Sequence, residues 1–152
     1  MTTTPSHPPP AFFEEALQRA QRLLGSGKRC ILGIAAAKLG ASQVTGCDID
    51  EIAVATAEAN AIRNGVSDAC WMHSAKRIEG QYDMVVANIL TNPLCVLAPS
   101  LVEHVKPGGL LALSGVLAIQ AEQVIDAYAP YISLTVGAEH EGWIRLEGRK
   151  AC

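Results

Sequence analysis

The chain of 152 residues has no cysteines at metal-binding or redox spacing. There are five cysteines, an odd number, and no Cys-x-x-Cys pair, which argues against both a disulfide framework and a zinc site. The four histidines are scattered along the chain, so we expect no bound metal. Three cysteines with apolar neighbours are expected to be buried as small hydrophobic residues: Cys47, Cys70 and Cys95.

The chain also lacks an excess of positive charge and a long apolar run. Twelve basic residues against 15 acidic ones give a net charge of −3, so there is no basic surface of the kind that binds phosphates in nucleic acid. No apolar stretch approaches the ~20 residues that a membrane helix needs. The first residues resemble no secretory signal. We therefore expect a cytoplasmic protein that binds neither a membrane nor nucleic acid directly.

The composition is that of a folded chain. Hydrophobic residues make up 49% and charged residues 18%, whereas an average domain has roughly 25% charged residues. A chain of this length corresponds to one domain, at roughly 100–200 residues per domain. Residues 1–10 are rich in proline, which fixes φ and removes an N–H donor. We predict a flexible tail over 1–10 and a single domain over 11–152.

The order of apolar and polar residues predicts alternating strands and helices. A helix is predicted from Ala11 to the glycines at 25–27, and the apolar run at 30–39 is ambiguous, although its alanines and Gly40 favour a second helix. Strands are then predicted at 43–47, 69–73, 83–87 and 110–114, and helices at 51–64, 93–105 and 118–129. Residues 106–109 form a predicted turn. The strands 132–138 and 143–147 are expected to pair as an antiparallel hairpin around 139–142.

This alternation predicts an α/β fold. Continuous apolar strands are typical of a mainly parallel sheet with helices on both faces, here closed by the C-terminal antiparallel hairpin. Ligands of such open sheets bind outside the carboxyl ends of the strands, so functional residues are expected there. The two tryptophans, Trp71 and Trp143, are expected to pack in the core.

An acid follows the strand predicted at 43–47. The Asp48 carboxylate could accept hydrogen bonds from both hydroxyls of a ribose, and Ile49 could pack on a purine ring. The alternative is that Asp48 or Asp50 caps the helix that begins near Glu51. We expect Asp50 to be the cap and Asp48 to be the ribose acceptor.

An amide ends the strand predicted at 83–87. The carbonyl of Asn88 could accept an N–H from an incoming amine, so that the nitrogen lone pair points at an electrophile. The alternative is an Asx-turn that satisfies nearby backbone groups, and the residue alone favours that interpretation. If both strands are parallel, Asp48 and Asn88 are expected to lie over the same edge of the sheet.

In this order, these segments resemble the class I S-adenosylmethionine-dependent methyltransferases, and more closely the catalytic domain of the ribosomal protein L-eleven methyltransferase family. The matching stretches are residues 31–40 (ILGIAAAKLG), 44–65 (VTGCDIDEIAVATAEANAIRNG), 82–90 (YDMVVANIL), 106–117 (KPGGLLALSGVL) and 141–150 (EGWIRLEGRK). The resemblance implies a Rossmann-like fold, the cofactor S-adenosyl-L-methionine, and methyl transfer to a protein nitrogen, with a ribosomal protein as substrate. It implies that Asp48, Ile49 and Asn88 bind the cofactor and that Asn88 is also the catalytic residue.

The sequence departs from the family in two places. Nothing in it corresponds to the family's amino-terminal domain, and Gly27–Cys30 lead directly into Ile31, where the family has a first strand and an Asp-x-Gly-x-Gly-x-Gly loop. Such glycines let the backbone approach the methionine part of the cofactor. Two functions therefore remain open: a methyltransferase, or a truncated remnant that binds cofactor weakly or not at all. A dinucleotide-binding oxidoreductase is disfavoured, because no Gly-x-Gly-x-x-Gly follows a predicted strand.

Overall fold

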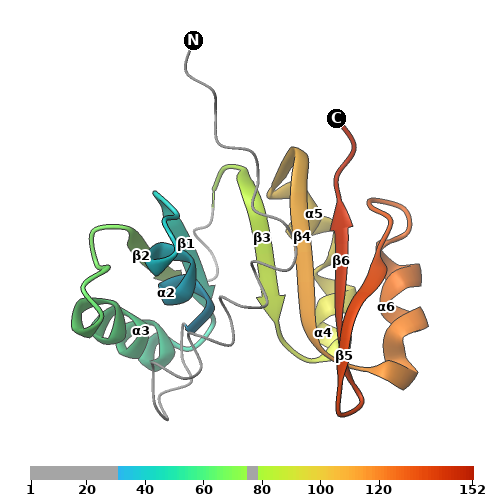
Figure 1. The fold of residues 1–152 in the computed structure, drawn as a ribbon, viewed down its shortest axis with the longest axis horizontal. Coiled ribbons are helices and arrows are strands. Elements are labelled where there is room, and N and C mark those ends of the chain that lie inside the picture. Colours follow the sequence, from blue (N-terminus) through green and yellow to red (C-terminus); the bar gives the residue numbers. More distant parts are fainter. Residues whose placement is uncertain (1–30, 75–78) are drawn as a thin grey trace. The chain divides into compact units, whose positions relative to one another are not determined.

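The computed structural model describes residues 31–74 and 79–152 (Figure 1). The predictions for the tail at 1–10, the helix from Ala11 and the glycines at 25–27 lie outside the described residues. The chain divides into two compact units, Met1–Ile78 and Glu79–Cys152. The single domain over 11–152 stays a prediction.

The described part of the first unit contains two helices and a pair of parallel strands. The order along the chain is α2 (Ile31–Lys38), β1 (Val44–Asp48), α3 (Glu51–Arg63) and β2 (Cys70–Ser74). Helix α3 is the crossover that parallel strands require. A small buried cluster joins the helices to the strands. Its members are Ile34, Ala61 and Cys70, with the partly buried Ala37, Val44 and Val66 against them.

Glycines end both described helices of this unit. Gly65 has a φ of +67°; its N–H donates to the Ile62 carbonyl, and the Val66 N–H donates to the Ala61 carbonyl, both at 3.0 Å. This pair of bonds is the Schellman motif, which a residue with positive φ makes possible. Gly40, with a φ of +101°, ends α2 in the same way. The predicted helix over the ambiguous apolar run and both glycine stops are confirmed.

The second unit is a four-stranded sheet with helices packed on it. Strand β3 is parallel to β4, and β6 lies between β4 and β5 and is antiparallel to both. The elements are β3 (Tyr82–Asn88), α4 (Thr91–Val96), α5 (Ala98–Glu103), β4 (Val105–Leu117), the 3-10 helix η2 (Ala118–Gln120), α6 (Ala121–Tyr128), β5 (Thr135–His140) and β6 (Trp143–Arg149). The predicted C-terminal hairpin is therefore confirmed, with Glu141 and Gly142 as its two-residue turn.

Two predicted boundaries in this unit are wrong. The single helix at 93–105 is two short helices, α4 and α5, because Pro99 lacks an N–H and stands in the first turn of a new helix. The turn at 106–109 lies within β4, where the pairing jumps from Tyr82↔Val105 to Met84↔Leu110. The chain bulges there, and Lys106 forms a 3.1 Å ion pair with Asp83 on β3.

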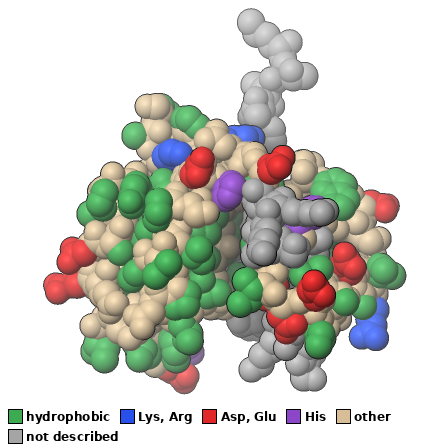
Figure 2. Space-filling model, turned by 180° about the vertical axis from the view of Figure 1, so that it is seen from behind, with side chains coloured by type: hydrophobic (Ala, Val, Ile, Leu, Met, Phe, Trp, Pro, Cys, Tyr) green, Lys and Arg blue, Asp and Glu red, His purple; other side chains and the backbone are tan. Residues whose placement is uncertain are grey.

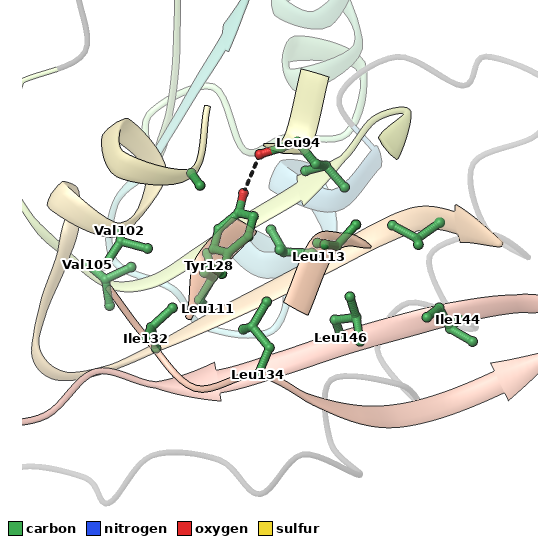
Figure 3. Packing of buried hydrophobic residues seen from close by; sticks show 13 residues of the cluster. Leu94, Val102, Val105, Leu111, Leu113, Tyr128, Ile132, Leu134, Ile144 and Leu146 are labelled. Atoms are coloured by element: carbon green, nitrogen blue, oxygen red, sulfur yellow. Dashed lines mark hydrogen bonds between the residues drawn. The ribbon is translucent and has the colours of Figure 1, made fainter. Parts of the chain in front are cut away.

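The core of the second unit lies between the sheet and helices α4, α5 and α6 (Figure 3). Alternate residues of β4 and β6 point into it, among them Leu111, Leu113 and Leu146, all almost fully buried. The phenol of Tyr128 donates a hydrogen bond of 2.9 Å to the Leu94 carbonyl. Burial, followed by the nearby Cys95, raises the pKa of the Tyr128 phenol well above its usual range.

Exposure corrects three predictions about buried side chains. Cys70 is buried as predicted and Cys95 partly so, but Cys47 is exposed. Trp71 and Trp143 were expected in the core and are 46% and 49% exposed. Figure 2 shows further hydrophobic side chains among polar ones on the surface of the molecule. Within residues 31–74 and 79–152, the structure holds no helix long and apolar enough to span a membrane and no cluster of metal-ligating side chains.

Candidate functional site

The carboxyl end of β1 carries two aspartates with different roles. Asp50 precedes α3, and its Oδ1 accepts a 2.9 Å hydrogen bond from the Ile52 N–H. The predicted helix cap is therefore confirmed. Asp48 is the last residue of β1, and its own Oδ1 accepts a 3.0 Å hydrogen bond from the Asp50 N–H. The turn between strand and helix thus fixes the direction of the Asp48 carboxylate.

The fixed Asp48 carboxylate remains available to a ligand. Asp48 is exposed, and in the described part of the chain no hydrogen bond reaches its Oδ2. An ionised carboxylate offers about four lone-pair sites on its two oxygens, so the two hydroxyls of a diol could still donate to it. Ile49 beside it is 89% exposed and offers apolar surface to a flat ring. The roles of Asp48 and Ile49 in cofactor binding stay predictions.

The neighbouring Cys47 does not add a second anion to this end of β1. Although the residue is exposed, desolvation of its thiol, followed by the charge of Asp48, raises the pKa of the Cys47 thiol. A thiol with a raised pKa stays protonated near neutral pH and is a poor nucleophile. Of these two neighbours, Asp48 is therefore the charged one.

The carboxyl end of β3 carries an amide without a local partner. Asn88 is the last residue of β3, is exposed, and stands opposite Ser114 of β4. Its backbone belongs to the sheet, but among the described residues no hydrogen bond engages its side chain. The alternative of an Asx-turn, which needs such a bond, is therefore wrong. The Asn88 amide is left to interact with something outside the fold.

Asn88 lies in a shallow pocket of about 400 Å³ in the second unit. The walls are mostly apolar, and none of the lining side chains is ionisable. The pocket is lined by Asn88, Ile89, Leu90, Ser114, Gly115 and Trp143. A neutral nitrogen could donate an N–H to the amide here, whereas a cation would find no negative partner among these residues.

The sequence did not reveal Trp143 as a wall of this pocket. Only the pairing of strands places it there, because Trp143 begins β6 opposite Leu117, the last residue of β4. An antiparallel strand that starts there places its first residue at the carboxyl end of the parallel pair. The half-exposed indole therefore lies over the strand ends rather than in the core.

Asp48 and Asn88 occupy equivalent places in two different units. Each is the last residue of a strand that pairs in parallel with its neighbour. Since β1 belongs to the first unit and β3 to the second, the expectation that both residues lie over one edge stays a prediction. The residues before α2 lie outside the described part of the chain, so the departure from the family's glycine-rich loop stays a prediction.

The sequence matches a known family over nearly its whole length. The pattern described as "Ribosomal protein L11 methyltransferase (PrmA)" matches residues 13–151. The chain is 55% identical over 126 residues to a ribosomal protein L11 methyltransferase of Dechloromonas aromatica, covering 83% of this chain and 41% of that protein. It is 46% identical over 149 residues to one of Burkholderia mallei, covering 91% of this chain and 46% of that protein. The chain thus spans less than half the length of these curated relatives.

Solved structures of similar shape agree with the sequence comparison. A ribosomal protein L11 methylase from Lactobacillus delbrueckii subsp. bulgaricus superposes with a TM-score of 0.77 at 29% identity, covering 92% of this chain and 77% of that one. An RNA methyltransferase from Salinibacter ruber, in complex with S-adenosyl-L-homocysteine, gives 0.65 at 17% identity, covering 96% and 94%. The second likeness concerns the fold alone. The predicted class I methyltransferase fold is confirmed.

Proposed function

Because the chain belongs to the ribosomal protein L11 methyltransferase family, we propose that it carries out S-adenosyl-L-methionine-dependent methyl transfer to a protein nitrogen. The observation that carries the proposal is the Asn88 amide, which has no partner among the described residues and lies in a pocket without ionisable side chains. We further propose that the protein is cytoplasmic and that its partner is a ribosomal protein, which presents a lysine or amino-terminal nitrogen.

The residues at the end of β1 fit the nucleoside part of this cofactor. Asp48 would accept hydrogen bonds from the ribose hydroxyls, because its carboxylate is held in place by the Asp50 N–H and still has free lone pairs. The exposed Ile49 would pack against the adenine ring. When bound, S-adenosyl-L-methionine supplies a sulfonium methyl group that a nitrogen lone pair can attack.

The pocket around Asn88 would select and orient the attacking nitrogen. Its lining has no ionisable side chain, so it favours a neutral amine over an ammonium ion. The Asn88 carbonyl would accept one N–H of that amine and so direct the lone pair. The apolar walls formed by Leu90 and Trp143 would shield the nitrogen from water. Positioning and desolvation would then supply most of the rate acceleration, and the excess proton of the methylated amine would pass to water.

A second candidate is a remnant of the family that no longer binds cofactor well. The observation in its favour comes from the sequence: Gly27–Cys30 lead directly into Ile31, where the family has a first strand and a glycine-rich loop. Such a protein would keep Asp48 and Asn88 without the backbone that holds the methionine part. The two candidates differ in a single measurable quantity, the affinity for S-adenosyl-L-methionine.

Isothermal titration of the full chain with S-adenosyl-L-methionine and with S-adenosyl-L-homocysteine distinguishes these functions. The methyltransferase proposal predicts saturable binding that Asp48→Ala weakens about 10–100-fold, since hydrogen bonds to a charged group contribute about 1.5–3 kcal/mol. Asp68→Ala is the matched control, because Asp68 is also exposed but precedes β2 rather than following a strand. Absence of heat at millimolar ligand would favour the remnant. Equal losses of affinity in both variants would contradict a specific role of Asp48 in cofactor binding.

A further inference from the structure

Strand β4 contains a bulge beside Asn88. The pairing of β4 with β6 shifts between Leu113↔Leu146 and Val116↔Ile144. Two residues of β4, Ser114 and Gly115, therefore face the single residue Arg145 of β6. Gly115 has a φ of +86°, in the left-handed region that glycine adopts without steric cost. Bulges with a left-handed glycine bend a strand and re-aim the side chains next to it.

This bulge presses the backbone of β4 against the end of β3. A methyl group on Gly115 would overlap the Ile89 carbonyl oxygen and would lie 3.1 Å from Oδ1 of Asn88. Position 115 therefore excludes any side chain for two reasons, its φ and its neighbours. Because Gly115 has only a hydrogen in place of a side chain, the Asn88–Ile89 segment can lie in contact with the backbone of β4.

A partly buried hydrogen bond holds the same segment further along the chain. Thr91, three residues after Asn88, is 4% exposed and is the one buried polar residue in the described part of the chain. Its hydroxyl donates a 2.8 Å hydrogen bond to Oε1 of Gln120, and the Leu117 N–H donates to the same oxygen at 3.4 Å. The Gln120 carbonyl thus ties the start of α4 to the end of β4.

We infer that the Gly115 bulge and the Thr91–Gln120 hydrogen bond are positioning devices that fix the Asn88 amide. Gly115 limits the segment at Asn88 and Ile89, and Gln120 anchors it three residues further along, at Thr91. Gly115, Thr91 and Gln120 act through Asn88 and are positioning residues rather than catalytic ones. The catalytic meaning of this device rests on the proposed function, whereas its effect on the position of Asn88 does not.

The first test measures the surroundings of Asn88 directly. In ¹⁵N-labelled full chain, the side-chain NH₂ signals of Asn88 are identified by their loss in Asn88→Asp. Gly115→Ala is expected to shift these signals. Gly80→Ala is the matched control, because Gly80 lies in the same unit with a φ of +90°, but a methyl group added to it would meet no atom within 4 Å. Unchanged Asn88 signals in a folded Gly115→Ala protein would overturn the inference.

The second test uses the hydrogen bond and keeps the inference testable if Gly115→Ala does not fold. Thr91→Val keeps the shape of the side chain and removes its hydroxyl, and Gln120→Met removes the acceptor. Both are expected to shift the Asn88 NH₂ signals. Gln123→Met is the control, because Gln123 also bridges to the α4 segment, through Asn92 at 3.3 Å, but on an exposed surface. Signals that move equally in the control would contradict a specific role for Gln120.

Methyl-transfer kinetics separate this inference from the proposed function. If the chain transfers methyl groups, misplacing Asn88 should lower kcat by up to about 100-fold, while KM for the cofactor changes little. A purely structural role would instead reduce the amount of active protein and leave the kinetic constants of the remaining fraction unchanged. If the chain shows no transfer, the proposed function fails, and the Asn88 signals still decide whether the positioning device exists.

Discussion

The two units differ in the size of the described buried cluster that accompanies each predicted functional residue. In the second unit, 13 buried residues pack between four strands and three helices, with leucine, valine and tyrosine side chains filling the space. In the described part of the first unit, the buried cluster has three members, and the buried residues of α3 are all alanines. Free energy from burial grows with the apolar area removed from water. Among the described residues, the buried cluster of the unit that holds Asn88 is therefore the larger of the two.

The largest effect is expected where the second unit is most densely packed. Tyr128→Ala removes a fully buried ring and its hydrogen bond to the Leu94 carbonyl, and should lower the free energy of unfolding by about 3–5 kcal/mol. Urea denaturation measures the loss. Tyr131→Ala is the control, because Tyr131 is 48% exposed, and its effect should stay within about 0.5 kcal/mol. Similar losses in both variants would show that the cluster does not dominate stability.

A smaller and more local effect is expected in the first unit. Ile34 is 1% exposed and is the largest member of the small cluster, so Ile34→Ala should destabilise its surroundings by about 2–4 kcal/mol. Hydrogen exchange should accelerate in β1 and β2 and remain unchanged in β4 and β6. Ile52→Ala, at a 74% exposed position of α3, serves as the control. Acceleration of all strands together would mean that the two units unfold as one.

The smallest effect is a loss of stability of the second unit at high pH. The pKa of the Tyr128 phenol is raised in the folded chain, so folding favours the protonated form. This contribution is complete below the ordinary tyrosine pKa near 10 and falls by about 1.4 kcal/mol per pH unit above it, until the folded group also ionises. Tyr128→Phe should lack this dependence. Urea midpoints of both proteins between pH 8 and 11 measure the difference; parallel curves would contradict it.

The sequence predicted best where the signal is local. The helix stops at Gly40 and Gly65 follow from backbone sterics at single residues, and the structure confirms both. The Asp50 cap requires a carboxylate two residues before an N–H in the first turn, and it was also predicted correctly. Such features depend on a few neighbouring residues, so the sequence around them is sufficient.

Predictions that depend on residues far apart in the chain were less successful. The pocket wall at Trp143 results from the pairing of β6 with β4, and Trp143 is separated by more than 50 residues from Asn88 along the chain. The bulge at Gly115 likewise appears only when β4 is aligned with both neighbours. Local propensity carries no information about register, so these residues were assigned to packing or to no role.

The place of β6 in the second unit has a consequence for how the chain folds during synthesis. Strand β6 follows β5 in the chain, yet it lies inside the sheet, between β4 and β5. A ribosome adds about 5–20 residues per second, so the nascent β4 waits for its neighbour until residues 143–149 have emerged. Loss of residues 143–149 would thus remove an interior strand rather than trim an edge, and β5 would lose its only hydrogen-bonded neighbour among the described strands.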